Sequence, residues 1–151
     1  MKARMTLVLV AAMALSAAGG WGAARASGRR HINLPGRTVT APFSEAVLVR
    51  DTLYVAGRLG LDPATGRPPG EAEAEARLLL DGMKAVLAEA GMAMDDLVSV
   101  EVFCTDLSLF ETWNAVYRGY FKGAPPARAF VGAGSLLRGA RFEALGVAVR
   151  R

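Results

Sequence analysis

The sequence predicts an α+β domain of two layers, in which two helices cover one face of a sheet. Segments with the alternation of β-strands occur in turn with segments whose apolar residues recur at helical spacing. Their order is ββαβαββ, and strands and helices in this order imply a sheet with helices packed on it. The chain has 151 residues, which suffices for one such domain with a substantial core.

The first half of the pattern contains two strands and a long helix. The strands are expected at 47–49 and 52–61, joined at Arg50-Asp51, and the segment 62–66 (DPATG) has the residues of a turn. The helix is expected from Glu71 to Ala90, because its apolar residues recur at helical spacing and acidic residues occupy its first turns. Gly91 suits the end of this helix.

The second half contains a strand, a helix and two further strands. The strand 97–105 alternates, with Val98, Val100, Val102 and Cys104 expected on one buried face. The helix is expected to begin with a capping box from Ser108 to Glu111 and to end before Pro125-Pro126. The last strands are expected at 129–134 and 141–150.

The amino terminus resembles a secretory signal peptide. Lys2 and Arg4 precede the uncharged apolar run 5–18, and Ala24-Arg25-Ala26 is a small-x-small cleavage site. This run is shorter than the ~20 residues that span a bilayer, so an uncleaved anchor is the weaker alternative. We expect a signal peptide at 1–26, with cleavage after Ala26 or nearer Ala18, a flexible linker at 27–38 and a periplasmic or secreted domain at 39–151.

Charge and composition argue against several partners. The chain has 18 bases and 14 acids, but three bases lie in residues 1–26, so the remainder carries a net charge of only +1. We therefore expect no nucleic-acid partner and no membrane partner after cleavage. With a single cysteine, Cys104, and a single histidine, His31, a metal site is not expected either. Cys104 is expected to be buried and structural.

Arg128 and Glu143 are the two residues that could carry chemistry. Arg128 follows two prolines at the start of a strand, so its guanidinium, which can bind a carboxylate with two parallel hydrogen bonds, would project from a fixed backbone. Glu143 lies in a strand that is apolar on both faces and is expected to be buried on both. A carboxylate there could position or activate water. The alternatives are a surface arginine and a structural ion pair of Glu143 with Arg141 or Arg138.

Several motifs resemble the RidA/YjgF family in the family's order. The carboxyl-terminal segment 125–150 (PPARAFVGAGSLLRGARFEALGVAVR) resembles the family's signature. Further matches are APFSEA at 41–46, LYVAG at 53–57, LDPATG at 61–66, VEVF at 100–103 and WNAVY at 113–117. Together they cover residues 40–151.

The resemblance implies a chorismate-mutase-like α+β fold that forms a homotrimer with clefts between subunits. It implies hydrolysis of reactive enamine and imine intermediates to 2-oxo acids and ammonia, without a cofactor. Arg128 would bind the substrate carboxylate, and Glu143 would hold the attacking water. Two alternatives remain: an exported trimeric protein that binds small carboxylates without turnover, and a chaperone-like protein.

The resemblance also places a set of residues at the cleft: Phe43, Ala56, Gly57, Arg58, Asn114 and Phe130. Family members often have tyrosine, serine, glutamine and cysteine at the positions of Phe43, Ala56, Arg58 and Phe130. We therefore expect a drier, more aromatic cleft with one added cation, and a substrate bulkier than iminopropanoate.

Overall fold

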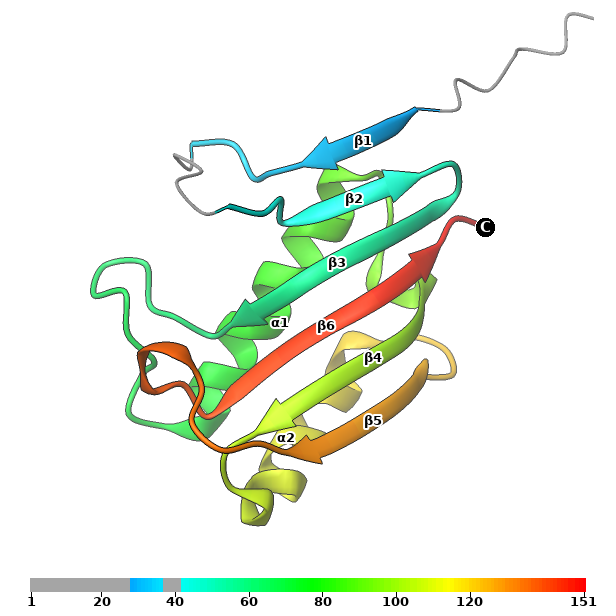
Figure 1. The fold of residues 1–151 in the computed structure, drawn as a ribbon. Coiled ribbons are helices and arrows are strands. Elements are labelled where there is room, and N and C mark those ends of the chain that lie inside the picture. Colours follow the sequence, from blue (N-terminus) through cyan, green and yellow to red (C-terminus); the bar gives the residue numbers. More distant parts are fainter. Residues whose placement is uncertain (1–27, 37–41) are drawn as a thin grey trace, which may run out of the picture.

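The computed structural model describes residues 28–36 and 42–151, which form one sheet with two helices (Figure 1). The expected signal peptide lies outside these residues. The elements are β1 (Arg29–Ile32), β2 (Ala46–Val49), β3 (Thr52–Leu59), α1 (Ala72–Glu89), β4 (Leu97–Cys104), α2 (Phe110–Tyr117), β5 (Ala127–Gly132) and β6 (Phe142–Val149). Short 3₁₀ turns occupy Met94–Asp96, Leu107–Leu109, Arg118–Tyr120 and Leu137–Gly139.

The sheet has six strands in the order β1-β2-β3-β6-β4-β5. All neighbours are antiparallel except β4 and β5, which are parallel and are connected through α2. Both helices cover the same face of the sheet (Figure 1). The predicted α+β class and the ββαβαββ order from β2 onward are therefore confirmed.

The prediction of a flexible linker at 27–38 is wrong for the part that forms β1. Arg29–Ile32 pairs with β2 in an antiparallel register from Arg29 opposite Val49 to Ile32 opposite Ala46. Charged residues at an edge strand hide the alternation that marks an inner strand, and edge strands commonly carry such charges. Ile32, which is 2% exposed, anchors β1 to the core.

The core lies between the sheet and the helices. Alternate residues of the central strands point into it, because successive side chains of a strand point to opposite faces. The fully buried side chains on this side include Leu53, Val100, Val102, Phe142, Ala144, Trp113 and the α1 residues Leu79, Leu80 and Met83. Cys104 is buried as predicted, and its burial raises the pKa of the thiol.

A buried ion pair fixes the start of β6 against α1. Glu75 of α1 is fully buried and pairs with Nε of Arg141 at 2.7 Å. Its Oε1 also accepts hydrogen bonds from the backbone N–H groups of Arg141 and Phe142, at 2.7 and 3.0 Å. Arg141 therefore pairs with Glu75 and not with Glu143, which removes one of the structural alternatives for Glu143.

Two local details differ from the sequence expectations. The helix turn before α2 is capped by Asp106, whose side chain accepts a hydrogen bond from the N–H of Ser108 at 2.9 Å, so the predicted Ser108 to Glu111 capping box is wrong. Val98 is 47% exposed because the register of β4 shifts between Leu97 and Ser99. Such a bulge changes the face on which the following residues lie.

The sheet face opposite the helices is open in the single chain. On β6, Glu143, Leu145 and Val147 point to this face and are partly exposed, while Phe142, Ala144 and Ala148 on the helix side are buried. The expectation that β6 is buried on both faces is therefore wrong for one chain alone. Among the described residues, no helix is both long enough and apolar enough to cross a membrane.

Candidate functional site

Arg128 points toward the helices from the edge strand β5. Val100 of β4 faces Arg128 in the parallel register, and Val102 faces Phe130. Paired residues of neighbouring strands lie on the same face of a sheet. Because Val100 and Val102 are fully buried beneath the helices, Arg128 and Phe130 are also on the helix side. The two prolines at 125 and 126 lead directly into this strand, as the sequence indicates.

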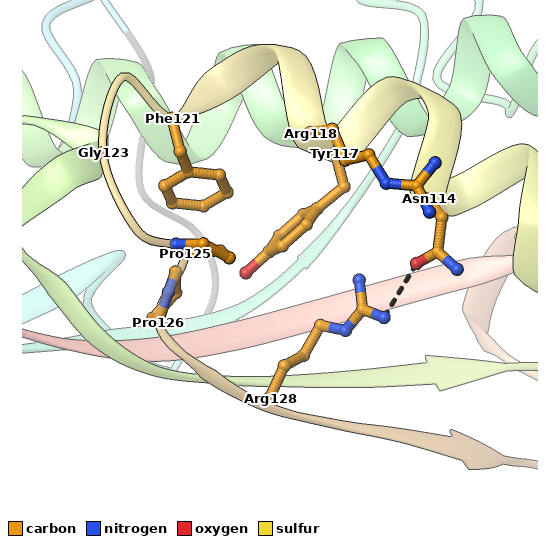
Figure 2. Close-up of a pocket in the computed structure, with 8 residues that line it drawn as sticks. All are labelled: Asn114, Tyr117, Arg118, Phe121, Gly123, Pro125, Pro126 and Arg128. Atoms are coloured by element: carbon orange, nitrogen blue, oxygen red, sulfur yellow. Dashed lines mark hydrogen bonds between the residues drawn. The ribbon is translucent and has the colours of Figure 1, made fainter.

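The Arg128 guanidinium is held by an amide and by three aromatic rings. Its Nη2 donates a hydrogen bond to Oδ1 of Asn114 at 2.8 Å (Figure 2). The guanidinium carbon lies 4.8 Å from the ring centroid of Tyr117, and 5.7 and 5.8 Å from those of Phe110 and Phe130. Cation–π contacts of this kind each contribute ~0.5 to 2 kcal/mol. The group is therefore oriented, and most of its five N–H groups remain available to a ligand.

A cavity of about 520 Å³ opens beside Arg128 (Figure 2). Its lining consists of Asn114, Tyr117, Arg118, Phe121, Gly123, Pro125, Pro126 and Arg128. The Tyr117 hydroxyl points from α2 toward the space between the proline segment and Arg128. Within 28–36 and 42–151 this buried hydroxyl has no hydrogen-bond partner. Burial raises the pKa of Tyr117 to about 12, so the hydroxyl stays protonated near neutral pH.

Glu143 lies on the opposite, open face of the sheet. In β6 it sits between Leu59 of β3 and Phe103 of β4. A Cβ added to Gly57 would collide with Oε1 of Glu143 and lie 3.3 Å from its carboxyl carbon. The glycine therefore leaves the space that the Glu143 carboxylate occupies. Gly57, which the family resemblance places at the cleft, thus lies directly against Glu143.

Arg128 and Glu143 cannot act together within one chain. Along β4, Glu143 is opposite Phe103 and Arg128 is opposite Val100, a separation of three residues. This corresponds to about 10 Å along the strand. An odd separation also places the two side chains on opposite faces. The structure thus contains two half-sites, one around Arg128 and one around Glu143.

The remaining expected cleft residues divide among three places. Asn114 and Phe130 belong to the Arg128 half-site. Ala56 lies next to Gly57, and its N–H donates to the carbonyl of Glu45 at 3.0 Å. Phe43, which is 57% exposed, lies two residues before Glu45 at the open end of the same strand pair.

Arg58 does not supply the expected cation to the cleft. The register of β3 shifts between Val55 and Arg58, so that Arg58 lies opposite Ala144 and points toward the helices. There it pairs with Glu45 at 3.1 Å and lies against Gly82 of α1. The bulge, which the sequence does not reveal, reverses the faces on which Arg58 and Leu59 lie.

The structure adds Tyr117, Arg118 and Phe121 to the Arg128 half-site. Their spacing from Asn114 is three, four and seven residues, which is the spacing of one helix face, although α2 continues only as a 3₁₀ turn at Arg118–Tyr120 and Phe121 is extended. That spacing is the signal that could have identified them. In the described part of the chain, no group of three or more histidine, cysteine, aspartate or glutamate side chains could hold a metal ion.

The mixed sheet with two helices on one face defines a small α+β protein with an oriented arginine beside a cavity. The family model described as endoribonuclease L-PSP matches residues 36–150. A mouse 2-iminobutanoate/2-iminopropanoate deaminase is 38% identical over 110 residues, which cover 72% of this chain and 82% of that protein.

Solved structures show the same fold. The structure of RidA from an Antarctic Psychrobacter has a TM-score of 0.74 and 30% identity over 80% of this chain and 98% of that chain. The E. coli YjgF gene product has a TM-score of 0.75 and 31% identity over 81% of this chain and 99% of that chain. The chain belongs to the RidA/YjgF family, whose family model carries the endoribonuclease L-PSP description.

Proposed function

We propose that this protein hydrolyses reactive enamine and imine intermediates to 2-oxo acids and ammonia. The observation that carries this proposal is the oriented guanidinium of Arg128, held by Asn114 and three rings beside a cavity. A 2-imino acid carries a carboxylate next to the reacting carbon. Binding of this carboxylate by Arg128 therefore also fixes the position of the reacting carbon. The named deaminase relative supports this assignment. It also disfavours the alternative of a binding protein without turnover.

The reaction needs little beyond orientation and water. The oxygen of water bonds to the electrophilic imine carbon as the carbon–nitrogen π bond breaks, and the nitrogen takes up one proton of this water. The remaining carbon–nitrogen bond then breaks as the new hydroxyl group becomes the carbonyl, and the hydroxyl proton goes to the nitrogen, which leaves as ammonia. In this mechanism Glu143 holds the water, accepts one of its protons and returns it to the nitrogen. A positioned acid or base contributes about two to four orders of magnitude in rate.

We propose that the working site lies between two chains of a homotrimer. Arg128 of one copy and Glu143 of the next would meet across the interface, because the two lie on opposite faces of one sheet. The open face supports assembly, since it carries exposed apolar side chains such as Tyr54, 54% exposed, and Val131, 44% exposed. Closed cyclic symmetry covers such a face with one repeated interface. Light scattering of the domain tests this, and a protein that stays monomeric at high concentration would contradict it.

We also propose that the domain is exported after removal of residues 1–26. The support is the sequence pattern of Lys2, Arg4, the uncharged run and the Ala24/Ala26 site. Amino-terminal sequencing of protein from the native host should find a start near Ser27. Recovery of the intact chain from the cytosol would contradict export.

The experiment that tests the activity is a coupled assay. An amino-acid oxidase generates imines from several amino acids, and the release of 2-oxo acid is followed with and without this protein. We expect faster release with the wild-type protein and almost none of that acceleration with Glu143→Gln. Equal rates with and without the wild-type protein for every imine would contradict the proposed function.

A further inference from the structure

The Arg128 cavity contains a second guanidinium, that of Arg118. Arg118 follows Asn114 by four residues, one turn along α2 and its 3₁₀ extension, so both side chains reach the same cavity. In Figure 2 the Asn114 amide lies between the guanidiniums of Arg118 and Arg128, while Phe121 and the two prolines form the other end. The cavity thus has a cationic end and an apolar end.

Neither cation of this cavity is neutralised by an acidic side chain of residues 28–36 or 42–151. No carboxylate is among the lining residues, and Arg118 has no ion pair anywhere in the described segments. Arg128 binds only the neutral amide of Asn114 and aromatic rings. A carboxylate that pairs bidentately with Arg128 satisfies one guanidinium. The charge of Arg118 then remains available for another anionic group.

The size of the cavity also exceeds the needs of the smallest imino acids. Pockets of ~300 to 1,000 Å³ hold drug-sized ligands, and this cavity measures about 520 Å³. The partnerless hydroxyl of Tyr117 is a further donor at the cavity and lacks an acceptor among the described residues. Two guanidiniums and a hydroxyl, with no acid, suit a ligand rich in acceptor oxygens.

We propose that Arg118 makes this site selective for imino acids that carry a second carboxylate in the side chain. Arg128 binds the carboxylate beside the reacting carbon, and Arg118 binds the side-chain carboxylate. This inference rests on the proposed imine hydrolysis and names the substrate class of that same site. The class corresponds to imines formed by oxidation of acidic amino acids.

The principal rival is that Arg118 and Arg128 share one carboxylate. In that case Arg118 would matter equally for every 2-imino acid, with or without an acidic side chain. If Arg118 binds a side-chain carboxylate, its removal should affect only substrates that have one. The two possibilities therefore differ in the ratio of two activities measured on the same variant.

The kinetic test compares imines made by a glutamate oxidase from glutamate and by an L-amino-acid oxidase from methionine. With Arg118→Gln, kcat/KM for the glutamate-derived imine should fall about tenfold to a hundredfold, as expected for loss of a charge-assisted hydrogen bond. For the methionine-derived imine the fall should stay within about threefold, the range of a screened surface charge. Equal falls for both imines, or no fall for either, would overturn the inference.

The control Lys84→Gln removes an exposed positive charge of α1 that does not line the cavity. It should leave both activities unchanged. If Lys84→Gln reduced the activity on the glutamate-derived imine as much as Arg118→Gln does, the effect would be one of overall charge, and the inference would fail.

A binding experiment separates this inference from the proposed function. Calorimetric titration of the wild-type protein with 2-oxoglutarate should give at least tenfold tighter binding than 2-oxohexanoate, which has an uncharged side chain. Arg118→Gln should abolish the difference. Absence of turnover with every imine would contradict the proposed function, whereas equal binding of the two 2-oxo acids by the wild type would contradict only the role of Arg118.

Discussion

Gly57→Ala should displace the Glu143 carboxylate without disturbing the fold. The added Cβ collides with Oε1 of Glu143, the far end of a flexible side chain, while no backbone atom is in close contact with it. To restore ordinary van der Waals separation, the carboxylate oxygen has to move by about 1 Å. A displacement of about 1 Å at a reacting group costs about a hundredfold in rate. We therefore expect kcat to fall about tenfold to a hundredfold.

The assay is the oxidase-coupled release of 2-oxo acid, combined with thermal melts. Gly70→Ala is the matched control, because a Cβ at Gly70 meets no atom within 4 Å. The Gly70→Ala variant should have the same melting temperature as Gly57→Ala and should keep full activity. A double-mutant cycle identifies the cause: if Gly57→Ala acts through Glu143, it should add little to the loss caused by Glu143→Gln.

Full activity in folded Gly57→Ala would refute the reasoning, because the carboxylate would then tolerate a displacement that a water-positioning group should not. Fully additive losses in the double variant would show that Gly57 acts on the substrate and not through Glu143.

Three further substitutions have expected outcomes. Arg128→Lys should reduce kcat/KM at least about tenfold, because an ammonium cannot make two parallel hydrogen bonds to a carboxylate; unchanged kinetics would show that Arg128 is structural. Glu143→Gln should lower turnover by about two to four orders of magnitude while calorimetry still detects 2-oxo acid binding; full activity would refute its role. Tyr117→Phe should raise the free energy of unfolding at pH 7 by about 1 kcal/mol, because it removes a buried hydroxyl without a partner. Because the pKa values of Tyr117 and Tyr120 are both raised to about 12, the wild type should also lose stability as the pH rises from 10 toward 12, and the phenylalanine variant should lose less because it retains Tyr120 but lacks Tyr117. A lower melting temperature of that variant at pH 7 would indicate a partner for the hydroxyl.

The sequence predicts the fold where the hydrophobic pattern alone determines the structure. The helix predicted from Glu71 to Ala90 is observed as Ala72–Glu89, and the five predicted strands agree with β2 to β6 within a few residues for the same reason. The pattern fails for β1, where arginines at an exposed edge hide the alternation. It also fails at the start of α2, where Asp106 and Ser108 compete as caps and only the backbone geometry decides between them.

In the sheet β1 is the edge strand beside β2, and the five strands β2 to β6 are the ones that the sequence predicts. The site is predicted less completely than these strands. Arg128 and Asn114 are brought together, and Glu143 lies with Gly57. Arg128 and Glu143 lie on opposite faces of the sheet because of the parallel register of β5 on β4, and no local sequence pattern encodes that register.

Arg58, which the sequence analysis expects in the cleft, lies on the helix side of the sheet. A bulge in β3 turns it toward Glu45 and α1, because one extra residue in a strand reverses the faces of those that follow. Arg118 is missed for a different reason. Its helical spacing from Asn114 is visible in the sequence. That spacing indicates a shared site only once the cavity, which Pro125 and Pro126 also line, is known.

The central claim is that Arg128 and Glu143 of different chains form one site, and a subunit-mixing experiment tests it most directly. Arg128→Ala and Glu143→Gln, each inactive alone, are co-expressed in equal amounts. In a randomly mixed ring, an intact site forms where Arg128 of one variant meets Glu143 of the other, which occurs at about a quarter of the interfaces. We therefore expect about a quarter of the wild-type activity to return. Mixed assemblies no more active than the separate variants would contradict a site shared between chains.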